Sequence, residues 1–234
     1  MPTIVAIDGP GAAGKSTTAR EVARRLGFRH LDTGAMYRAA TLACLERGLP
    51  EQETSRLAEF LKSLSIEFQP LSSGEQKLLL DGRDVTAAIR APLVSQRVSA
   101  YSALPIVRER LLAIQRRIGE QYDVVCEGRD IGTQVFPEAR FKFFLIADLE
   151  VRAQRRYEEL RSQGFDQPLD KVREEIRIRD HEDSTRKHSP LRKAKDAVPV
   201  DTSHMTIPAQ VEFVINHINT SLENDRLAGE TSSV

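Results

Sequence analysis

The sequence lacks tryptophan, has only two cysteines and shows no surplus of either charge among its 234 residues. Lysine plus arginine and aspartate plus glutamate both number 34, whereas a nucleic-acid-binding protein usually carries a basic surplus. Cys44 and Cys126 stand in apolar surroundings without CxxC or CxxH spacing, so we expect two reduced core thiols. The histidines form no metal-ligand cluster. These absences argue against a nucleic-acid partner, a disulfide framework and a metal site built from cysteine or histidine.

Long apolar runs are also missing. No stretch approaches the roughly 20 residues that a membrane-spanning helix requires, so we expect no membrane partner. The first residues lead directly into a short apolar run, without the basic and long apolar segments of a secretory signal. We therefore expect a cytoplasmic protein. No heptad seam or large apolar face is evident, and we expect a monomer.

The most informative segment present is Gly9 to Ser16, which reads GPGAAGKS and matches the phosphate-binding pattern G-x-x-x-x-G-K-[ST]. An apolar run precedes it and a helix-period segment follows it, which is the context that the motif requires. Such a turn directs backbone N–H groups and the positive end of a helix at one point, where polyphosphate oxygens can bind. The residues expected to hold ATP here are Gly9, Pro10, Gly11, Ala12, Ala13, Gly14, Lys15, Ser16 and Thr17. Lys15 can reach the β- and γ-phosphates, and the Ser16 hydroxyl can bind Mg²⁺.

Short apolar runs alternate with helix-period segments, which is typical of an α/β fold with a parallel sheet. Five core strands are expected, at residues 4–8, 29–31, 124–126, 141–146 and 197–200. Seven helices are expected, at residues 16–26, 35–46, 53–62, 105–120, 149–162, 169–181 and 208–222. The sequence therefore predicts a five-stranded parallel sheet flanked by helices.

One stretch breaks the alternation. Residues 65–69 and 77–86 read as strands around a turn region at 70–76, and Asp81-Gly82 indicates a hairpin. We expect a small antiparallel sheet inserted in the core. The predicted organisation is core (1–34), inserted lobe (35–100), core (101–151), lid (152–168), core (169–222) and a polar, disordered tail (223–234).

Arginine placement is the second informative feature. Arg129 follows directly after a predicted strand, where ligand crevices of open α/β sheets lie. Two phosphate groups repel each other, so an enzyme that joins them needs several converging guanidinium groups. The other candidates are Arg38, Arg152, Arg155, Arg156, Arg179 and Arg186. The alternative is that these arginines are solvated charges on helix faces, and this applies most to Arg155.

Four sequence blocks stand in order between residue 3 and about residue 217. They are Ile7–Thr17, Leu31–Arg38, Glu127–Thr133 with Val135–Pro137, and Arg179–Arg186 with Ser189–Leu191 and Asp201–Ser203. Together they resemble bacterial cytidylate kinases, a family of P-loop nucleoside monophosphate kinases, and the inserted antiparallel segment resembles that family's enlarged monophosphate-binding lobe. The P-loop alone is widespread, but the second and third blocks together are specific.

The resemblance implies transfer of phosphate from ATP to CMP, with dCMP as a second acceptor. It assigns Arg38, Arg129 and Arg186 to the acceptor phosphate, with Thr33 close by where many relatives carry serine. The base is assigned to Ser99, Arg108 and Asp130, and the sugar to Arg179 and Asp183. It places Arg152 and Arg156 in the lid over ATP. Lys15, Arg129, Arg156 and Arg186 are then the expected catalytic residues.

Chemistry supports the base assignment independently of the resemblance. Cytosine offers an amino donor at N4 and acceptors at N3 and O2, so its reader needs both an acceptor and a donor. Asp130 supplies the first and Arg108 the second. Uracil presents O4 in place of the amino group, so a desolvated Asp130 would face a second acceptor. We expect poor turnover of UMP. The alternative is that Asp130 is a structural partner of Arg129.

No general base is required, because the acceptor phosphate is already an oxyanion at neutral pH. Catalysis can then depend on positioning and charge neutralisation, which favours lobes that close and exclude water. Three carboxylates are open as holders of the Mg²⁺ waters: Asp8, Asp32 and Asp130.

The rival functions are a P-loop kinase for UMP, AMP or shikimate, a GTPase switch and a nucleic-acid-handling ATPase. The chain has no Asn-Lys-x-Asp segment, which a GTPase uses to read guanine. It also has neither the basic surplus nor the aromatic stripe of a single-strand-binding ATPase.

Overall fold

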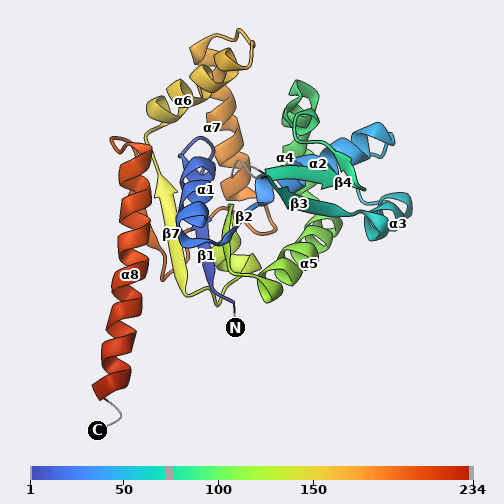
Figure 1. The fold of residues 1–234 in the computed structure, drawn as a ribbon. Coiled ribbons are helices and arrows are strands. Elements are labelled where there is room, and N and C mark those ends of the chain that lie inside the picture. The colour runs from blue at the N-terminus through green and yellow to red at the C-terminus, as the bar shows by residue number, and fades with distance from the viewer. Residues whose placement is uncertain (1, 72–75, 232–234) are drawn as a thin grey trace.

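The computed structural model describes residues 2–71 and 76–231 of the chain. A parallel sheet forms the centre, with strand order β2-β6-β1-β7-β8 (Figure 1). Its strands are β1 (Ile4–Asp8), β2 (Arg29–Asp32), β6 (Val124–Gly128), β7 (Phe141–Ile146) and β8 (Val198–Asp201). All four neighbouring pairs are parallel. The predicted α/β fold with a five-stranded parallel sheet is confirmed.

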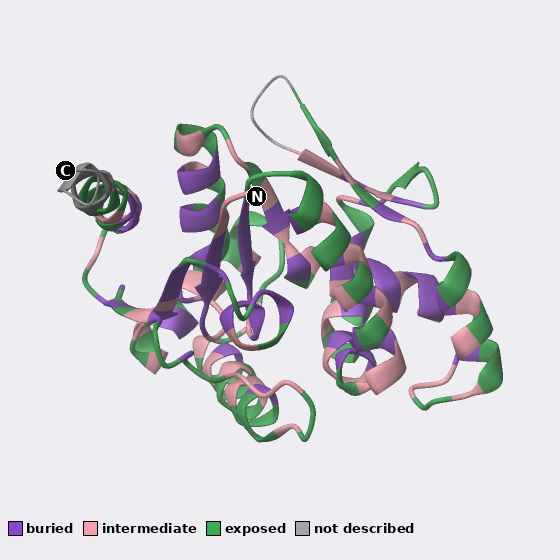
Figure 2. Cartoon of the chain, turned by 90° about the horizontal axis from the view of Figure 1, so that it is seen from below, coloured by how far each residue is buried: buried purple, intermediate pink, exposed green. Residues whose placement is uncertain are grey.

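Helices cover both faces of this sheet, so its central strands are buried on both sides (Figure 2). Val5 and Ile7 of β1 pack in a cluster with α1 (Lys15–Leu26) and α8 (Ile207–Thr231), whereas Ala6 between them joins the cluster on the other face. The remaining helices are α2 (Thr33–Glu46), α3 (Ser55–Ser63), α4 (Pro92–Ala103), α5 (Pro105–Gln121), α6 (Leu149–Ser162) and α7 (Leu169–Thr185). Among the described helices, none combines the length and apolarity that crossing a bilayer demands.

Helix α4 (Pro92–Ala103) is absent from the sequence prediction. Its serines and valines have weak helix propensity, and they show no clear helical periodicity. Tertiary packing stabilises it instead: Val94, Val98 and Tyr101 are buried, and the Tyr101 hydroxyl donates to the Leu49 carbonyl over 2.6 Å. Proline at the first position of α4, and again at the start of α5, separates the two helices.

The inserted antiparallel sheet is also confirmed. It consists of β3 (Ile66–Pro70), β4 (Gln76–Leu80) and β5 (Arg83–Asp84), in that order. Asp81 and Gly82 both have positive φ, as expected of the predicted hairpin turn. Of the turn region predicted between β3 and β4, residues 72–75 lie outside the described residues. Leu78 and Leu80 are buried in the same cluster as α2 and α5, so the core of this lobe is continuous with one face of the main sheet.

The predicted disordered tail is corrected over residues 223–231, because α8 continues to Thr231. Arg140, one residue before β7, donates to the Ser221 carbonyl and forms an ion pair with Asp225. These contacts hold the polar end of the helix where the sequence offers no apolar periodicity to indicate it. The last part of the predicted tail, residues 232–234, lies outside the described residues.

A π-helical turn, η2 (Ile131–Val135), follows β6 at the carboxyl edge of the sheet. The Asp8 carboxylate, at the end of β1, accepts from the Ile131 and Gly132 N–H groups, each over 2.8 Å. This carboxylate therefore fixes the segment that carries Arg129 and Asp130. Burial raises the pKa of Asp8 to about 6, with the two backbone N–H groups opposing the rise.

Replacing Asp8 by Asn tests this contact through pH dependence. With a folded-state pKa of about 6 against an ordinary 3.8, the folded chain binds a proton that the unfolded chain has released. The resulting stability is present below about pH 4 and is lost as the pH rises through 6. The free energy of unfolding of the unmodified protein, relative to Asp8→Asn, should fall by about 2 kcal/mol between pH 4 and 6.5, measured by urea unfolding. Asp170→Asn on α7 is the control. A difference that is constant over this range contradicts the assignment.

Candidate active site at the carboxyl edge of the sheet

The predicted phosphate loop joins β1 to α1 and needs glycine at two positions. Gly9 has φ +149°, and a Cβ there would lie 2.1 Å from the Leu145 carbonyl oxygen. Gly14 has φ +90°, and a Cβ there would lie 2.8 Å from Oε1 of Gln210. That Gln210 oxygen also accepts from the Thr18 hydroxyl over 2.7 Å. Strand β7 and helix α8 therefore press against the loop and set its path.

Lys15 lies buried at the centre of this loop. Its Nζ donates to the Pro10 carbonyl over 2.6 Å. Burial lowers the pKa of Lys15 to about 7, and the nearby Arg129 guanidinium lowers it further, against several carboxylates that raise it. Burial outweighs these carboxylates, and a phosphate group within reach would favour the charged ammonium.

The Ser16 hydroxyl points at a carboxylate that the sequence analysis missed. It donates to Oε2 of Glu127 over 2.7 Å, and Oε1 of the same carboxylate contacts Nε2 of His30 at 3.1 Å. Burial raises the pKa of Glu127, but His30, Lys15 and Ser16 outweigh this and hold it below its ordinary value. Glu127 opens the third sequence block, and its place at the end of a buried strand was the available indication.

The three carboxylates left open for Mg²⁺ have other partners in this structure. Asp8 accepts from two backbone N–H groups of η2. Asp32 caps α2 by accepting from the Ala35 N–H over 2.8 Å. Asp130 forms an ion pair with Arg108. Among the residues that the structure describes, Glu127 is therefore the carboxylate that contacts the hydroxyl of the P-loop serine.

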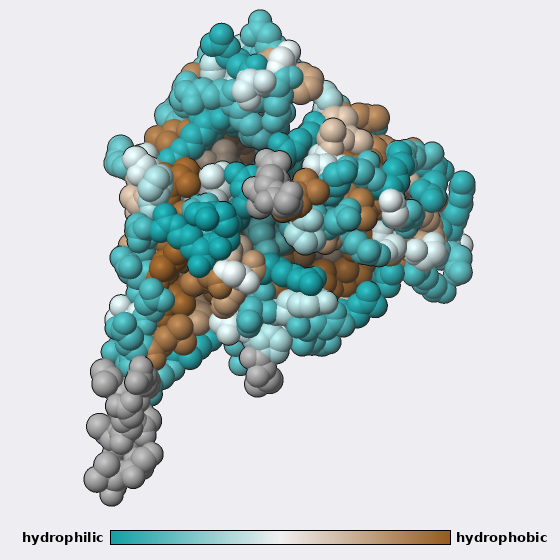
Figure 3. Space-filling view, in the orientation of Figure 1, coloured by the Kyte–Doolittle hydropathy of each residue, from teal (hydrophilic) through white to brown (hydrophobic). Residues whose placement is uncertain are grey.

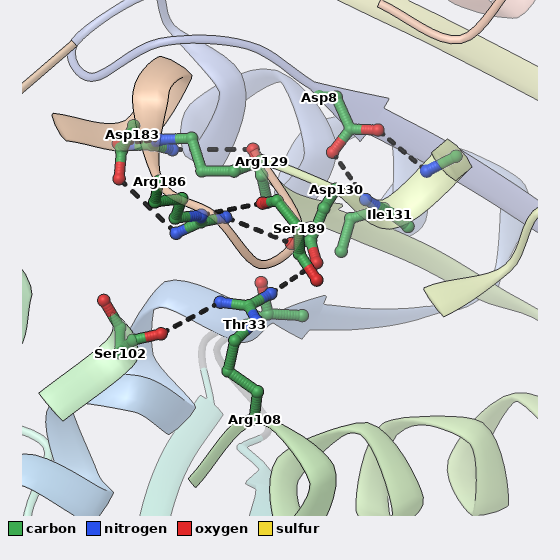
Figure 4. A network of polar contacts seen from close by, with 12 residues as sticks. Asp8, Thr33, Ser102, Arg108, Arg129, Asp130, Ile131, Asp183, Arg186 and Ser189 are labelled. Atoms are coloured by element: carbon green, nitrogen blue, oxygen red, sulfur yellow. Dashed lines mark hydrogen bonds and ion pairs between the residues drawn. The ribbon is translucent and has the colours of Figure 1, made fainter. Parts of the chain in front are cut away.

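Most of the predicted acceptor-site residues meet beside the loop (Figure 4). Nε of Arg129 donates to Oδ2 of Asp183 over 2.8 Å, and Arg186 lies 3.6 Å from the other oxygen of that carboxylate. Arg186 is also 3.8 Å from Asp130, whose second oxygen pairs with Arg108. Two buried carboxylates thus separate three guanidinium groups that come from α5, from the end of β6 and from the end of α7.

Guanidinium N–H groups exceed acceptors in this cluster. Nε of Arg108, Nε of Arg179 and one terminal nitrogen of Arg186 are buried without a hydrogen-bond partner. Burial lowers the pKa values of Arg179 and Arg186, and a neighbouring guanidinium lowers each further. Buried cationic N–H groups without hydrogen-bond partners destabilise the folded protein unless an anion binds among them. The cluster is therefore suited to a phosphate.

Arg38 approaches the same place from α2. It donates to the Ser95 hydroxyl over 2.8 Å, and burial together with the Arg179 and Arg156 charges lowers its pKa to about 10. Thr33, at the start of α2, is buried and donates to the Glu127 carbonyl over 2.7 Å. Ser99 is connected to Arg108 only through Ser102: the Ser99 carbonyl accepts from the Ser102 hydroxyl, and the Ser102 carbonyl accepts from Arg108.

The predicted lid residues divide into three roles. Arg152 is buried and donates to Oδ2 of Asp180 over 2.6 Å and to the Gly11 carbonyl of the loop over 3.4 Å. Arg155 holds the segment after β8 by donating to the Thr202 carbonyl over 2.6 Å, so it is not a solvated charge. Arg156 pairs with Glu159 on the same helix and is partly exposed. The hairpin of α6 and α7 is coated with hydrophilic residues, and a notch separates it from the inserted lobe (Figure 3).

Comparison with known proteins places nearly the whole chain in one family. Residues 5–220 match the protein family described as Cytidylate kinase. A curated cytidylate kinase from Chlorobaculum tepidum is 46% identical over 232 residues, which cover 97% of each chain. One from Caldanaerobacter subterraneus is 46% identical over 94% of this chain and 96% of its own. One from Limosilactobacillus fermentum is 44% identical over the same shares. The chain belongs to the cytidylate kinase family.

Proposed function

We propose that this chain transfers the γ-phosphate of ATP in line to the phosphate of CMP or dCMP, the reaction of its family. The observation that supports this most directly is the cluster of buried guanidinium groups, some of their N–H groups without partners, beside an intact phosphate loop. Arg129 of this cluster lies beside the loop, because a Cβ at Gly11 would be 3.7 Å from its terminal nitrogen, and phosphoryl transfer between two nucleotides needs adjacent anion sites.

The loop and the lid would hold ATP. Backbone N–H groups of the loop and the start of α1 surround the phosphates, and Lys15 carries its charge to them. Arg152 already contacts Gly11 and can join this set. Arg156, which is partly exposed and pairs with Glu159 here, would reach the phosphates when the lid closes. A dry site strengthens each of these charge interactions.

The residues present fit a magnesium ion. The Ser16 oxygen and the Glu127 carboxylate are adjacent hard oxygen donors. Within the described residues, no three His, Cys, Asp or Glu side chains form a group that could hold a metal alone. This suits Mg²⁺, which keeps waters and shares its ligands with substrate phosphates. When bound, Mg²⁺ neutralises charge on the β- and γ-phosphates.

The acceptor phosphate would bind among Arg38, Arg129 and Arg186. The carboxylate of Asp183 keeps Arg129 and Arg186 apart and oriented, and Arg179 and Asp183 would contact the sugar. The acceptor phosphate is ionised at neutral pH, so no residue needs to remove a proton. The site would lower the barrier by holding two phosphate groups together against their repulsion. Exclusion of water by the inserted lobe and the lid would prevent hydrolysis of ATP.

Arg108 and Asp130 would read the base. They line a cavity of about 150 Å³ together with Tyr37 and Ser189. Asp130 can accept from the cytosine amino group while Arg108 donates to the ring acceptors, and Ser99 would assist from α4. The predicted division into core, inserted lobe (35–100) and lid (152–168), the monomeric state and the cytoplasmic location stay proposals alongside these residue roles.

The acceptor specificity is tested with a panel of CMP, dCMP, UMP, AMP and shikimate in a coupled ADP-release assay. CMP and dCMP should be phosphorylated, and UMP should show a kcat/KM lower by about tenfold to several-hundredfold, because Asp130 would face the O4 acceptor. Equal kcat/KM for UMP and CMP would refute the reading of the base pocket.

Replacing Asp130 by Asn should reduce the preference for CMP over UMP. The amide can turn its NH₂ toward O4 of uracil, and Arg108 loses its ionic partner. We expect kcat/KM for CMP to fall by about 10-fold or more and the CMP/UMP ratio to fall by a similar factor. Asp84→Asn on β5 is the matched control. An unchanged ratio would mean that Asp130 only orients arginines.

Replacing Lys15 by Met should lower kcat by about 10²–10³-fold, because the transferred phosphate loses the positive charge that the loop directs at it. The fold should be retained, since methionine buries well and a desolvated ammonium is removed. Circular dichroism and a thermal melt report on the fold, and Lys62→Met on α3 is the control. Turnover that survives in Lys15→Met contradicts the assignment.

A further inference from the structure

A chain of side-chain contacts runs from the inserted lobe to the P-loop serine. Nε2 of Gln76 lies 3.3 Å from Nδ1 of His30, and Nε2 of His30 lies 3.1 Å from Oε1 of Glu127. The other carboxylate oxygen of Glu127 accepts from the Ser16 hydroxyl over 2.7 Å. These four residues belong to β4, β2, β6 and α1, so the contacts link two sheets and the phosphate loop.

The direction of each hydrogen bond follows from the partners. The Glu127 carboxylate can only accept, so the Ser16 hydroxyl and Nε2 of His30 both donate to it. In the neutral imidazole Nδ1 is then the acceptor, and the Gln76 NH₂ group donates to it. The three contacts are therefore compatible with one another, because each donor faces an acceptor.

Burial makes this series hard to rearrange. The side chain of Glu127 is 4% exposed and that of His30 is 11% exposed. In the parallel pairing of β2 with β6, His30 stands opposite Val125, and Asp32 stands opposite Glu127. His30 thus reaches Glu127 diagonally across neighbouring strands. Without the imidazole, one oxygen of a buried carboxylate would lose its donor, and the side chain could leave Ser16 for another rotamer.

We propose that His30 is a positioning residue that holds Glu127 beside Ser16, and that Gln76 couples this position to the inserted lobe. The inference rests on the proposed function, in which Ser16 and Glu127 face the Mg²⁺ and phosphates of ATP. Movement of β4 when the acceptor binds lengthens or shortens the Gln76 contact, and His30 passes the change to the carboxylate. The acceptor lobe is in this way connected to the ATP side by side chains that touch neither nucleotide.

The variants are His30→Leu, His30→Gln, Gln76→Ala and the double variant His30→Leu/Gln76→Ala. Glutamine in place of His30 keeps a donor for Glu127 and an acceptor for Gln76. Gln69→Ala is the matched control, because Gln69 is exposed on β3 in the same small sheet, opposite Lys77. Each variant is measured for kcat, for KM of CMP, and for binding of a non-hydrolysable ATP analogue over a range of Mg²⁺ concentrations by calorimetry.

His30→Leu should raise the Mg²⁺ concentration needed for analogue binding and lower kcat, each by about 10-fold, since loss of a partner that orients a ligand costs about 10–100-fold. The KM for CMP should stay within about twofold, because the acceptor pocket is intact. His30→Gln should restore most of the loss. Gln76→Ala should cost about threefold, and Gln69→Ala should match the unmodified protein.

Coupling is tested by the double variant. If Gln76 acts through His30, its substitution has no further effect on kcat or Mg²⁺ dependence in the His30→Leu background. Additive losses would overturn the coupling. A His30→Leu variant that melts at a lower temperature but keeps its kcat and Mg²⁺ dependence would reduce His30 to a structural role and overturn the positioning proposal.

A spectroscopic readout is independent of turnover. In a long-range ¹H–¹⁵N spectrum at pH 8, His30 should show the tautomer with its proton on Nε2 in the unmodified protein, in Gln69→Ala and in Gln76→Ala, because the Glu127 carboxylate accepts from Nε2 in all three. A neutral imidazole with its proton on Nδ1 would overturn the contact on which the positioning proposal depends. A protein that fails to phosphorylate CMP at all contradicts the proposed function. One that phosphorylates CMP but tolerates His30→Leu contradicts only this inference.

Discussion

Repulsion between buried guanidinium groups is the constraint on which the rest of this structure depends. Arg108, Arg129 and Arg186 meet at the carboxyl edge of the sheet, and among the described residues Asp130 and Asp183 are the carboxylates that pair with them. Such a cluster holds together only if its carboxylates are rigidly placed. The strands, the π-helical turn held by Asp8, and the end of α7 supply that rigidity. The guanidinium N–H groups left without a partner support the proposal that this cluster binds phosphate.

The two halves of the site are built by different physical means. On the ATP side, backbone geometry matters most, because Gly9 and Gly14 take conformations that only glycine adopts easily and the neighbouring chain leaves no room for a side chain. On the acceptor side, long charged side chains from separate elements converge. The first half leaves little room for motion, whereas the second would change if the inserted lobe and the lid close as proposed. This difference suits a site that must hold one substrate while it encloses another.

Much of the fold was predictable from local pattern, but contacts between elements were not. The phosphate loop, the five strands and the Asp81-Gly82 hairpin each carry their evidence within a few residues. Helix α4 does not, because its stability comes from the burial of Tyr101 and two valines against neighbours. Glu127 was overlooked as a partner of Ser16 because the two are separated by 111 positions, and only the parallel register of β1 with β6 brings them together. The extension of α8 similarly depends on Arg140.

The Gln210 side chain lies against Gly14 of the phosphate loop, and this contact affects when the loop can form during synthesis. Gln210 fixes the turn through Thr18, 192 positions earlier, so the earliest-made part of the chain is shaped by one of the latest. During synthesis, this contact can form only after α8 has left the ribosome and docked. A chain terminated before α8 therefore lacks both the hydrogen bond to Thr18 and the side chain that lies against Gly14.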